Sequence, residues 1–462
     1  MLWLVVLFLL GAMIASRRTK GPIWAMAIAW LVSIVPVASG AVIYKFFNEG
    51  SPDYALTLFI YLGCYFAGGF LWRALPRSVL SSSSPSSVRR DLLSGQAVTA
   101  FVWWVAIGGS ACVLIDFFVS GGPGLDDLAA LRDQIVGSKG ASTLAQIGSV
   151  LTWACLYCYI FALGFRALLG PRRFLLMLLP IAGYFMLSVV SAGRQAAFQI
   201  MIVALLVTLQ NQARRRALRE AVAPVKARAP RSLSRVVAGF ALVAAMTGYM
   251  GYVAVTRVDG QVSDDKGTII LNVFKAEISD QVDRVISAGG PQVRSAIVEG
   301  IVYFTSPVAL FQNFLSVPIR HSTYGALSVP FLFRQVQGLT GIVQMDTLNG
   351  KVDRLSASSV IGSGWTTGMS SFIEDFGPVG ALVVLFGLGF YSEAAWDRAC
   401  RSHNLNDAVV GIVVLLIAIY MPLIFAFSDT NILLMWAFAV ALQALSPRRQ
   451  AIDRSASALS AA

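Results

Sequence analysis

Charged side chains are scarce in this sequence. Only 13% of the 462 residues are Asp, Glu, Lys or Arg and 56% are hydrophobic, whereas an average soluble domain carries roughly 25% charged residues. A disordered chain has fewer apolar residues than this, and a single water-soluble domain has more charge. The composition therefore excludes both classes and indicates a polytopic membrane protein.

Histidine and cysteine are also few. The two histidines are His321 and His403, and all five cysteines lie in or beside apolar runs. Their number and placement exclude a disulfide-stapled secreted scaffold. Cys155 and Cys158 have the spacing of a redox motif, but no thioredoxin-like pattern surrounds them. We therefore expect them to pack as small apolar residues.

Apolar runs recur along the whole chain. About 20 apolar residues cross a hydrocarbon layer of ~30 Å, and by that rule the sequence predicts an all-α fold with eleven spans. The first run is followed, not preceded, by basic residues, which is the wrong polarity for a cleaved signal peptide. The spans are expected near residues 2–16, 22–44, 54–72, 98–119, 144–165, 174–190, 196–210, 236–256, 376–395, 407–426 and 432–445.

The basic residues predict the orientation of these spans. With the N-terminus outside, the inner loops and tail collect 23 of the 36 Lys and Arg residues, and the short outer loops hold four: Lys45, Arg132, Lys139 and Arg194. This asymmetry is what the positive-inside rule expects. The net charge of +12 thus follows from membrane topology. The basic 211–235 run is expected to be a cytoplasmic orientation signal in contact with anionic lipid, and no nucleic-acid partner is expected. The predicted location is the bacterial inner membrane, with a periplasmic N-terminus and a cytoplasmic C-terminus.

Four regions follow from this orientation. We expect eight transmembrane helices with short loops in 1–256, a large periplasmic loop in 257–370, three further transmembrane helices in 371–445 and a cytoplasmic tail in 446–462. The loop carries nine basic and nine acidic residues, and loops of such length are usually functional. Within it, residues 301–315 are apolar but too short to span, so we expect a helix lying on or dipping into the outer leaflet.

Ionisable residues are nearly absent from the middle of the predicted spans. Asp116 lies at the outer end of its span, and Glu393 and Asp407 lie at inner ends. Buried ionisable residues usually mark ion or proton pathways, so their scarcity argues against an ion-coupled transporter. We expect the functional chemistry at the outer surface instead.

The outer turn Ser191–Gln195, with the sequence SAGRQ, separates two short apolar runs. At 1.5 Å per residue the two helices would be only ~25 and ~22 Å long, which brings their shared turn close to the outer headgroups. Arg194 would then lie at the depth of a lipid phosphate, and a guanidinium pairs with phosphate oxygens through two parallel hydrogen bonds. The alternative is that Arg194 contacts ordinary headgroups.

The large loop supplies further candidates. His321 could serve as a general base near neutral pH, or could be an inert surface residue. The loop also carries a set of arginines able to bind an anion: Arg257, Arg284, Arg294, Arg320, Arg334 and Arg354.

Four stretches together resemble a known family. They are the SAGRQ turn, GLDDLAALRDQI with Arg132, the passage YFTSPVALFQNFL to STYGALSVPFLF, and GSGWTTGMSSFIEDFGPVGALVVLFGLGF, in which Asp375-Phe376-Gly377 precedes a span. With the many apolar runs and one large outer loop, they are similar to Wzy-type O-antigen and exopolysaccharide repeat-unit polymerases. That family shares the GT-C-like fold of O-antigen ligases.

The resemblance implies a metal-independent glycosyltransferase without a cofactor. Its substrate would be an undecaprenyl-pyrophosphate-linked oligosaccharide, and a chain-length regulator and a flippase would be its partners. Arg194 would neutralise the pyrophosphate, and the base would be Asp375, Glu374, Glu299 or His321. The residues expected to bind substrate are Arg132, Arg257, Arg320, Arg354, Tyr303 and Tyr324.

Three other functions remain open from the sequence. An O-antigen ligase would use a loop histidine with a characteristic downstream glycine pattern, which the residues after His321 do not reproduce cleanly. A flippase or small-solute transporter would line its central cavity with charge. A structural membrane protein is compatible with the charge balance of the 257–370 loop.

Overall fold

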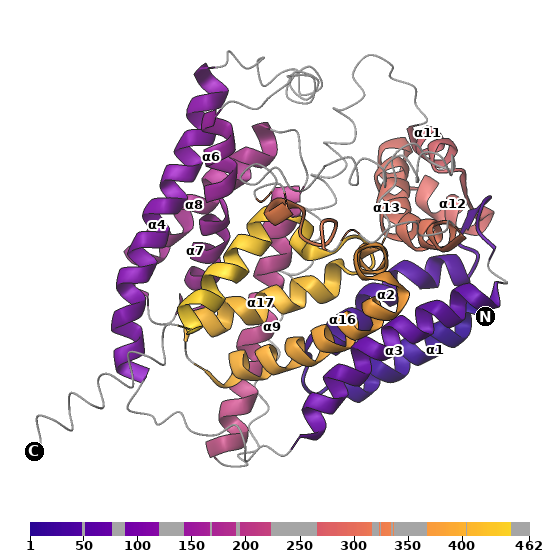
Figure 1. The fold of residues 1–462 in the computed structure, drawn as a ribbon. Helices are drawn as coiled ribbons and strands as arrows, with labels where there is room; N and C mark the ends of the chain where they lie inside the picture. The colour runs from indigo at the N-terminus through magenta and orange to yellow at the C-terminus, as the bar shows by residue number, and fades with distance from the viewer. Residues whose placement is uncertain are drawn as a thin grey trace, which may run out of the picture.

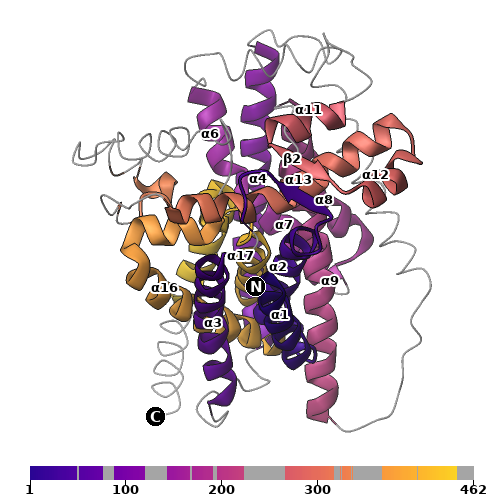
Figure 2. The same cartoon turned by 90° about the vertical axis from the view of Figure 1, so that its right-hand side faces the viewer.

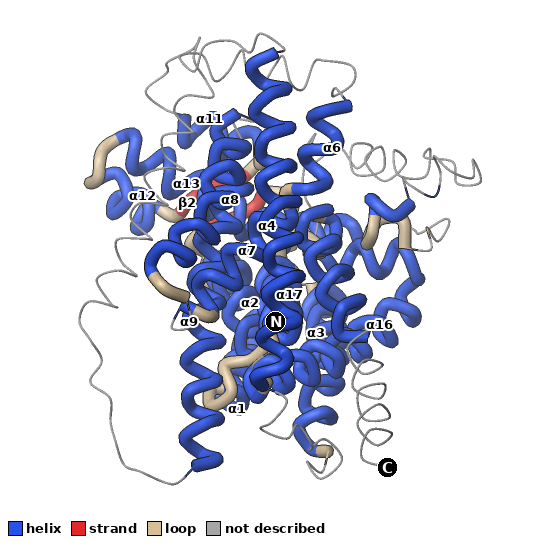
Figure 3. The backbone as a smooth tube through the Cα atoms, turned by 90° about the vertical axis from the view of Figure 1, so that its left-hand side faces the viewer, coloured by secondary structure: helices blue, strands red, loops and turns tan. Residues whose placement is uncertain are grey.

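A computed structural model describes residues 1–48, 51–75, 88–119, 143–166, 169–190, 195–222, 266–316, 323, 325–333, 336, 367–402 and 404–444. Most of this part is helical, with two short strands (Figure 3). The elements are α1 (Leu2–Ser16), α2 (Pro22–Ala38), β1 (Val42–Tyr44), α3 (Pro52–Ala74), α4 (Val88–Val119), α6 (Thr143–Leu151), α7 (Trp153–Gly164), α8 (Pro171–Val190), α9 (Gln195–Val222), α11 (Lys266–Val273), β2 (Ala276–Ile278), α12 (Asp280–Ser287), α13 (Pro291–Ser316), α16 (Gly368–Arg401), α17 (Leu405–Tyr420), η4 (Ala426–Ser428) and a last described helix, Thr430–Ala444.

The helices confirm an all-α membrane protein. Within the described ranges, six helical segments are long and apolar enough to cross a bilayer, and four apolar helices are shorter. The six are Pro52–Ala74, Val98–Asp116, Ile147–Gly164, Ala196–Arg216, Val293–Ser316 and Gly368–Arg401. The expected total of eleven spans stays a prediction, because the span expected near 236–256 lies outside the described residues.

One predicted span is wrong in its last few residues. The helix expected over 22–44 ends at Ala38, and residues Val42–Tyr44 form β1. Gly40 adopts a φ of +68°, which an L side chain rarely adopts, so the chain leaves the helix there. β1 pairs in antiparallel register with β2, with Ile43 opposite Glu277. The N-terminal helices are thereby joined to the large loop.

The core of the bundle is α17. This helix is apolar along nearly its whole length, and twelve of its 16 residues are buried. It packs against α2, α7, α9 and α16 (Figure 1). A helix that is hydrophobic on every side suits a protein interior or a membrane span, and α17 is enclosed by these four helices.

α3 and α16 pack backbone against backbone. At Gly68 a Cβ would lie 2.0 Å from the carbonyl oxygen of Phe386, and at Gly389 a Cβ would lie 1.9 Å from that of Tyr65. Two glycines therefore let the backbones touch. Small residues at such crossings are the usual means of packing helices in a membrane, where burial from water supplies no driving force between them.

The two ends of the bundle differ in charge. α3, α9 and α16 all finish at one end, close to basic residues that include Arg73, Arg214, Arg398 and Arg401. We refer to it as the basic end. α11, α12 and α13 lie at the other end, together with the starts of α3, α9 and α16 (Figures 1 and 2). We refer to that end as the loop end.

α13 lies over the loop end of the N-terminal helices. The hydroxyls of Tyr44 and Thr305 are 2.7 Å apart, and the Tyr54 hydroxyl donates to the Val308 carbonyl at 2.5 Å. Burial raises the pKa of the Tyr44 phenol above its usual range, so the phenol stays protonated. Figure 2 shows α13 crossing above the start of α3. α13 is longer than the expected 301–315 and is one of the six segments long and apolar enough to span, so a helix lying on the outer leaflet stays a prediction.

Candidate functional site

Asp375, at the start of α16, holds the segment 325–333 against the bundle. Its side chain is completely buried. One carboxylate oxygen accepts from the Leu327 N–H at 3.1 Å and from the Thr323 hydroxyl. The other accepts from the Ser328 N–H at 2.7 Å and from the Ser328 hydroxyl. With both oxygens engaged by protein donors and no exposure, this carboxylate is placed to fix a loop, not to take a proton from a substrate.

The Gly-Pro pair after Asp375 turns the chain from this anchor into the long part of α16. Gly377 has a φ of +72°, and Pro378 lacks an N–H. The Tyr61 hydroxyl on α3 donates to the Pro378 carbonyl at 3.1 Å. In the Asp-Phe-Gly sequence, Asp375 thus holds the 325–333 segment, and Gly377 bends the chain just before the long part of α16.

A second polar group at the loop end joins four parts of the bundle, and we name it the Asp429 network. It consists of Thr152, Tyr184, Gln199, Asp429 and Asn431. The Tyr184 hydroxyl donates to the Gln199 side-chain oxygen, and the Gln199 amide nitrogen donates to one Asp429 oxygen. The other Asp429 oxygen accepts from the Asn431 N–H at 2.8 Å, and the Thr152 hydroxyl lies 3.0 Å from the Asn431 side-chain oxygen. Asp429 therefore also caps the last described helix.

The Asp429 network and the Asp375-held segment are neighbours. The Ser428 hydroxyl donates to the Leu327 carbonyl at 3.5 Å, and the Leu327 N–H is one of the donors to Asp375. Two carboxylates far apart in the sequence are thus linked through one backbone segment. Asp429 is partly exposed, whereas Asp375 is fully buried.

Aromatic rings adjoin the Asp429 network. Phe198, one residue before Gln199, stacks on Tyr420 with ring centres 6.2 Å apart, and it lies 6.5 Å from Phe304 on α13. Tyr303 packs edge-on against Phe304 and is 39% exposed. On this side of the loop end, the partly exposed rings of Phe198 and Tyr303 therefore lie near the partly exposed Asp429 carboxylate.

The predicted site residues are only partly placed. Glu374 is 3% exposed beside Asp375, and Glu299 and Tyr303 lie on α13. Among these, Tyr303 is the one whose neighbours reach the Asp429 network. The remaining predicted residues lie outside the described part of the chain, so their convergence stays a prediction: Arg132, Arg194, Arg257, Arg320, His321, Tyr324 and Arg354.

Sequence reasoning missed Asp429, Gln199 and Tyr184. Asp429 is the one charged residue in the short connection between the last two apolar runs, and Gln199 is an amide within an apolar run. Both features were visible in the sequence. The expected topology could have linked the two residues. It places the start of the 196–210 run, with Gln199, and the end of the 407–426 run, just before Asp429, at the same outer surface.

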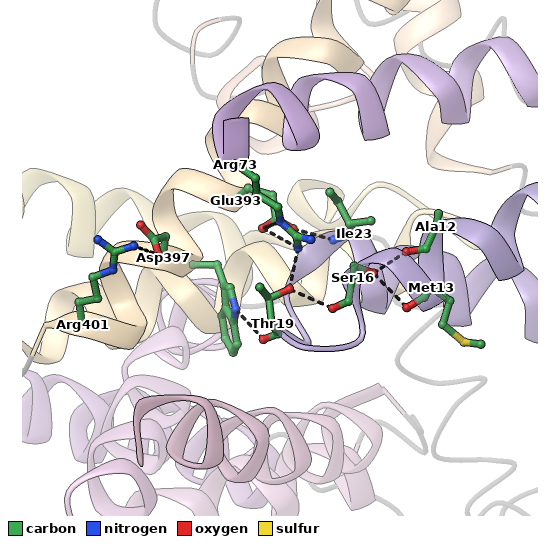
Figure 4. Close-up of polar contacts among 10 residues, drawn as sticks. Ala12, Met13, Ser16, Thr19, Ile23, Arg73, Glu393, Asp397 and Arg401 are labelled. Carbon is green, nitrogen blue, oxygen red and sulfur yellow. Dashed lines mark hydrogen bonds and ion pairs between the residues drawn. The ribbon is translucent and has the colours of Figure 1, made fainter. Parts of the chain in front are cut away.

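The basic end carries a different polar cluster (Figure 4). Arg73 donates from Nε and Nη2 to the two oxygens of Glu393 at 3.0 and 2.9 Å, and from Nη2 to the Thr19 hydroxyl at 2.7 Å. Glu393 also accepts from the Ile23 N–H at 3.0 Å, and it is 3% exposed. These contacts fasten α3 and α16 to the connection between α1 and α2. The cluster is a structural brace with its charges paired internally.

The Asp429 network, the adjoining rings and the Asp375 anchor together form the candidate functional site. Comparison with known proteins gives no further guide, since no protein family, curated protein or solved structure matches the chain.

Proposed function

We propose that this chain is a glycosyltransferase that polymerises undecaprenyl-pyrophosphate-linked oligosaccharide repeat units on the periplasmic face of the bacterial inner membrane. The observation that carries the proposal is the separation of the two ends. Basic residues gather at one end, and at the other a carboxylate, amide and hydroxyl network adjoins aromatic rings. By the positive-inside rule the basic end faces the cytoplasm, so the candidate site faces the periplasm.

The position of α9 supports a role for Arg194 in this reaction. Arg194 directly precedes Gln195, the first residue of α9, and Gln199 of the same helix belongs to the Asp429 network. The leaving group is a lipid pyrophosphate that gains negative charge as the sugar departs. An arginine can stabilise that charge electrostatically without a metal ion.

The chemistry of the described site supports a sugar as the group that is bound. A sugar ring presents apolar C–H faces and a rim of hydroxyls. Tyr303 and Phe198 supply partly exposed ring faces, and Asp429 supplies a hydrogen-bonding carboxylate near them, with the buried Tyr420 and Gln199 packed behind. A few polar groups within a largely apolar surface are typical of small-molecule sites.

Replacing Arg194 tests the proposal. In a strain lacking the wild-type chain, Arg194→Ala should leave glycans of a single repeat unit, because the pyrophosphate is no longer neutralised. Lys45→Ala is the matched control, since Lys45 is an exposed loop-end cation paired with exposed Glu277, and it should give full-length glycan. The readout is glycan length on gels, with membrane levels of each variant measured by immunoblot.

Two outcomes would contradict the proposal. Full-length glycan from well-expressed Arg194→Ala would remove the role of Arg194. Accumulation of single lipid-linked units on the cytoplasmic face of a deletion strain would indicate a flippase, whereas accumulation on the periplasmic face is expected for a polymerase.

A further inference from the structure

The two loop-end carboxylates both accept hydrogen bonds from the protein, Asp429 from Gln199 and from the N–H groups of Asn431 and Ile432, but they differ in exposure. Asp375 is fully buried, and four donors from residues 323–328 bind its two oxygens. Asp429 is partly exposed, and it lies beside a group of rings that includes the exposed Tyr303. A general base must reach the proton that it abstracts. Of these two carboxylates, Asp429 is the one placed to do so.

We propose that Asp429 is the general base of the transferase and that Asp429, with the partly exposed rings of Phe198 and Tyr303, lines the subsite for the acceptor sugar. The buried side chains of Gln199, Tyr184 and Tyr420 support this subsite from within the bundle. This inference rests on the proposed function, and it names a residue that the sequence did not single out. The ligand class is a pyranose-type sugar hydroxyl at the end of a lipid-linked unit.

The reaction balances with the two substrates alone. The acceptor hydroxyl gives its proton to an Asp429 oxygen, and the hydroxyl oxygen forms a bond to the anomeric carbon of the donor sugar. The bond between that carbon and the pyrophosphate oxygen breaks, and its electron pair leaves with the lipid pyrophosphate. The carboxyl proton then passes to water, which restores the carboxylate.

Gln199 and Tyr184 act as positioning residues. The Tyr184 hydroxyl donates to the Gln199 oxygen, which directs the amide nitrogen of Gln199 toward Asp429. The carboxylate is held from its other side by the N-terminus of the last described helix. A base oriented by a second side chain, which is itself oriented by a third, is a recurring arrangement in transferases and hydrolases.

The test distinguishes two roles of Asp429, that of general base and that of helix cap. Asparagine and serine both cap helices well, but neither takes a proton as a carboxylate does. Asp429→Asn and Asp429→Ser should therefore fold. In proteoliposomes supplied with lipid-linked repeat units, each should lose polymerisation rate by about 10²- to 10⁴-fold. Asp407→Asn is the control, since Asp407 is a hydrogen-bonded carboxylate at the basic end, and it should keep the wild-type rate.

The positioning role of Gln199 is tested by measuring kcat and KM for the Gln199→Ala variant. It should lower kcat while leaving KM for the acceptor nearly unchanged, because it disorders the base without removing the rings. A purely structural role would instead lower the unfolding temperature and leave the kcat of the folded fraction intact.

The possible failures are distinguishable. If wild-type protein polymerises and folded Asp429→Asn or Asp429→Ser does so at the same rate, the base assignment is wrong and the proposed function stands. If wild-type protein makes no polymer from these substrates, the proposed function is wrong as well.

Discussion

Asp375 shows how a buried carboxylate can organise a loop instead of reacting. Its oxygens collect two backbone N–H groups and two hydroxyls from residues 323–328. A loop cannot bury backbone N–H groups without acceptors, so the carboxylate removes a desolvation penalty from the whole segment. The result is a fixed segment next to the Asp429 network.

Asp375→Asn should therefore destabilise the protein. The amide nitrogen of the new asparagine would face N–H and hydroxyl donors, so at least one buried donor would lose its acceptor. We expect this loss to lower the free energy of unfolding by about 1–3 kcal/mol. The measurement is thermal unfolding in detergent, with Asp280→Asn on the exposed start of α12 as the control of near-zero effect. An unchanged unfolding temperature for Asp375→Asn would show that the anchor is unimportant.

Arg73 and Glu393 give a second prediction at this scale. Arg73→Ala leaves the Glu393 carboxylate buried without its cation, which should destabilise the protein by about 3–5 kcal/mol. The exposed pair Arg401–Asp397, with 2.7 Å between its charged atoms, is the control, and Arg401→Ala should cost less than about 1 kcal/mol. Adding Glu393→Gln to Arg73→Ala should recover part of the loss in the same unfolding assay. Equal effects of the two arginine variants would contradict the role of burial.

The sequence identified some of these residues but not their partners. Asp375 was singled out by the motif that precedes a span, yet the donors that bind it lie 47 to 52 residues earlier in the chain. Its predicted role as a base depended on an exposure that a sequence does not encode. Asp429 was missed because a lone acidic residue in a short connection carries no pattern.

At the scale of elements, α3 and α16 depend on two glycines. The Cβ that Gly389 lacks would overlap the Tyr65 carbonyl oxygen, and backbone atoms cannot move aside as a side chain would. The two helices would have to separate and lose part of their shared interface. Gly387, two residues away on the same helix, has open space around its Cβ position.

Gly389→Ala should lower the free energy of unfolding by about 1–3 kcal/mol, the usual range for overpacking. Gly387→Ala should be neutral or slightly stabilising, because alanine favours the helix by about 1 kcal/mol over glycine. Chemical or thermal unfolding in detergent compares the two. The close packing of α3 and α16 would be contradicted if both substitutions raised stability.

The length of each apolar run predicted most of the helices. In a membrane, an apolar run of that length forms a helix because its backbone N–H and C=O groups must hydrogen-bond to one another. Two elements departed from this prediction. The 22–44 run was apolar to its end, but Gly40 and pairing with residues 276–278 made its last part a strand. The helix expected over 301–315 proved to be the second half of α13, which begins at Pro291 in a more polar stretch.

For the whole molecule, orientation is the prediction that matters most. In a chain whose five native cysteines are replaced, Glu277→Cys at the loop end and Arg18→Cys at the basic end both lie at exposed positions. A membrane-impermeant maleimide should label Glu277→Cys in intact spheroplasts. It should label Arg18→Cys only after the membrane is opened, because the basic end is expected in the cytoplasm. The reverse pattern would place the candidate site in the cytoplasm and exclude a periplasmic polymerase.

The burial of α17 constrains how the protein is made. A ribosome delivers α2, α7 and α9 to the membrane well before residue 405, yet these helices pack around α17 in the finished bundle. Until α17 is synthesised, their facing surfaces must contact lipid, one another or an insertion chaperone. The centre of this protein is therefore filled late in synthesis, and a nascent chain interrupted before α17 leaves α2, α7 and α9 without their shared packing partner.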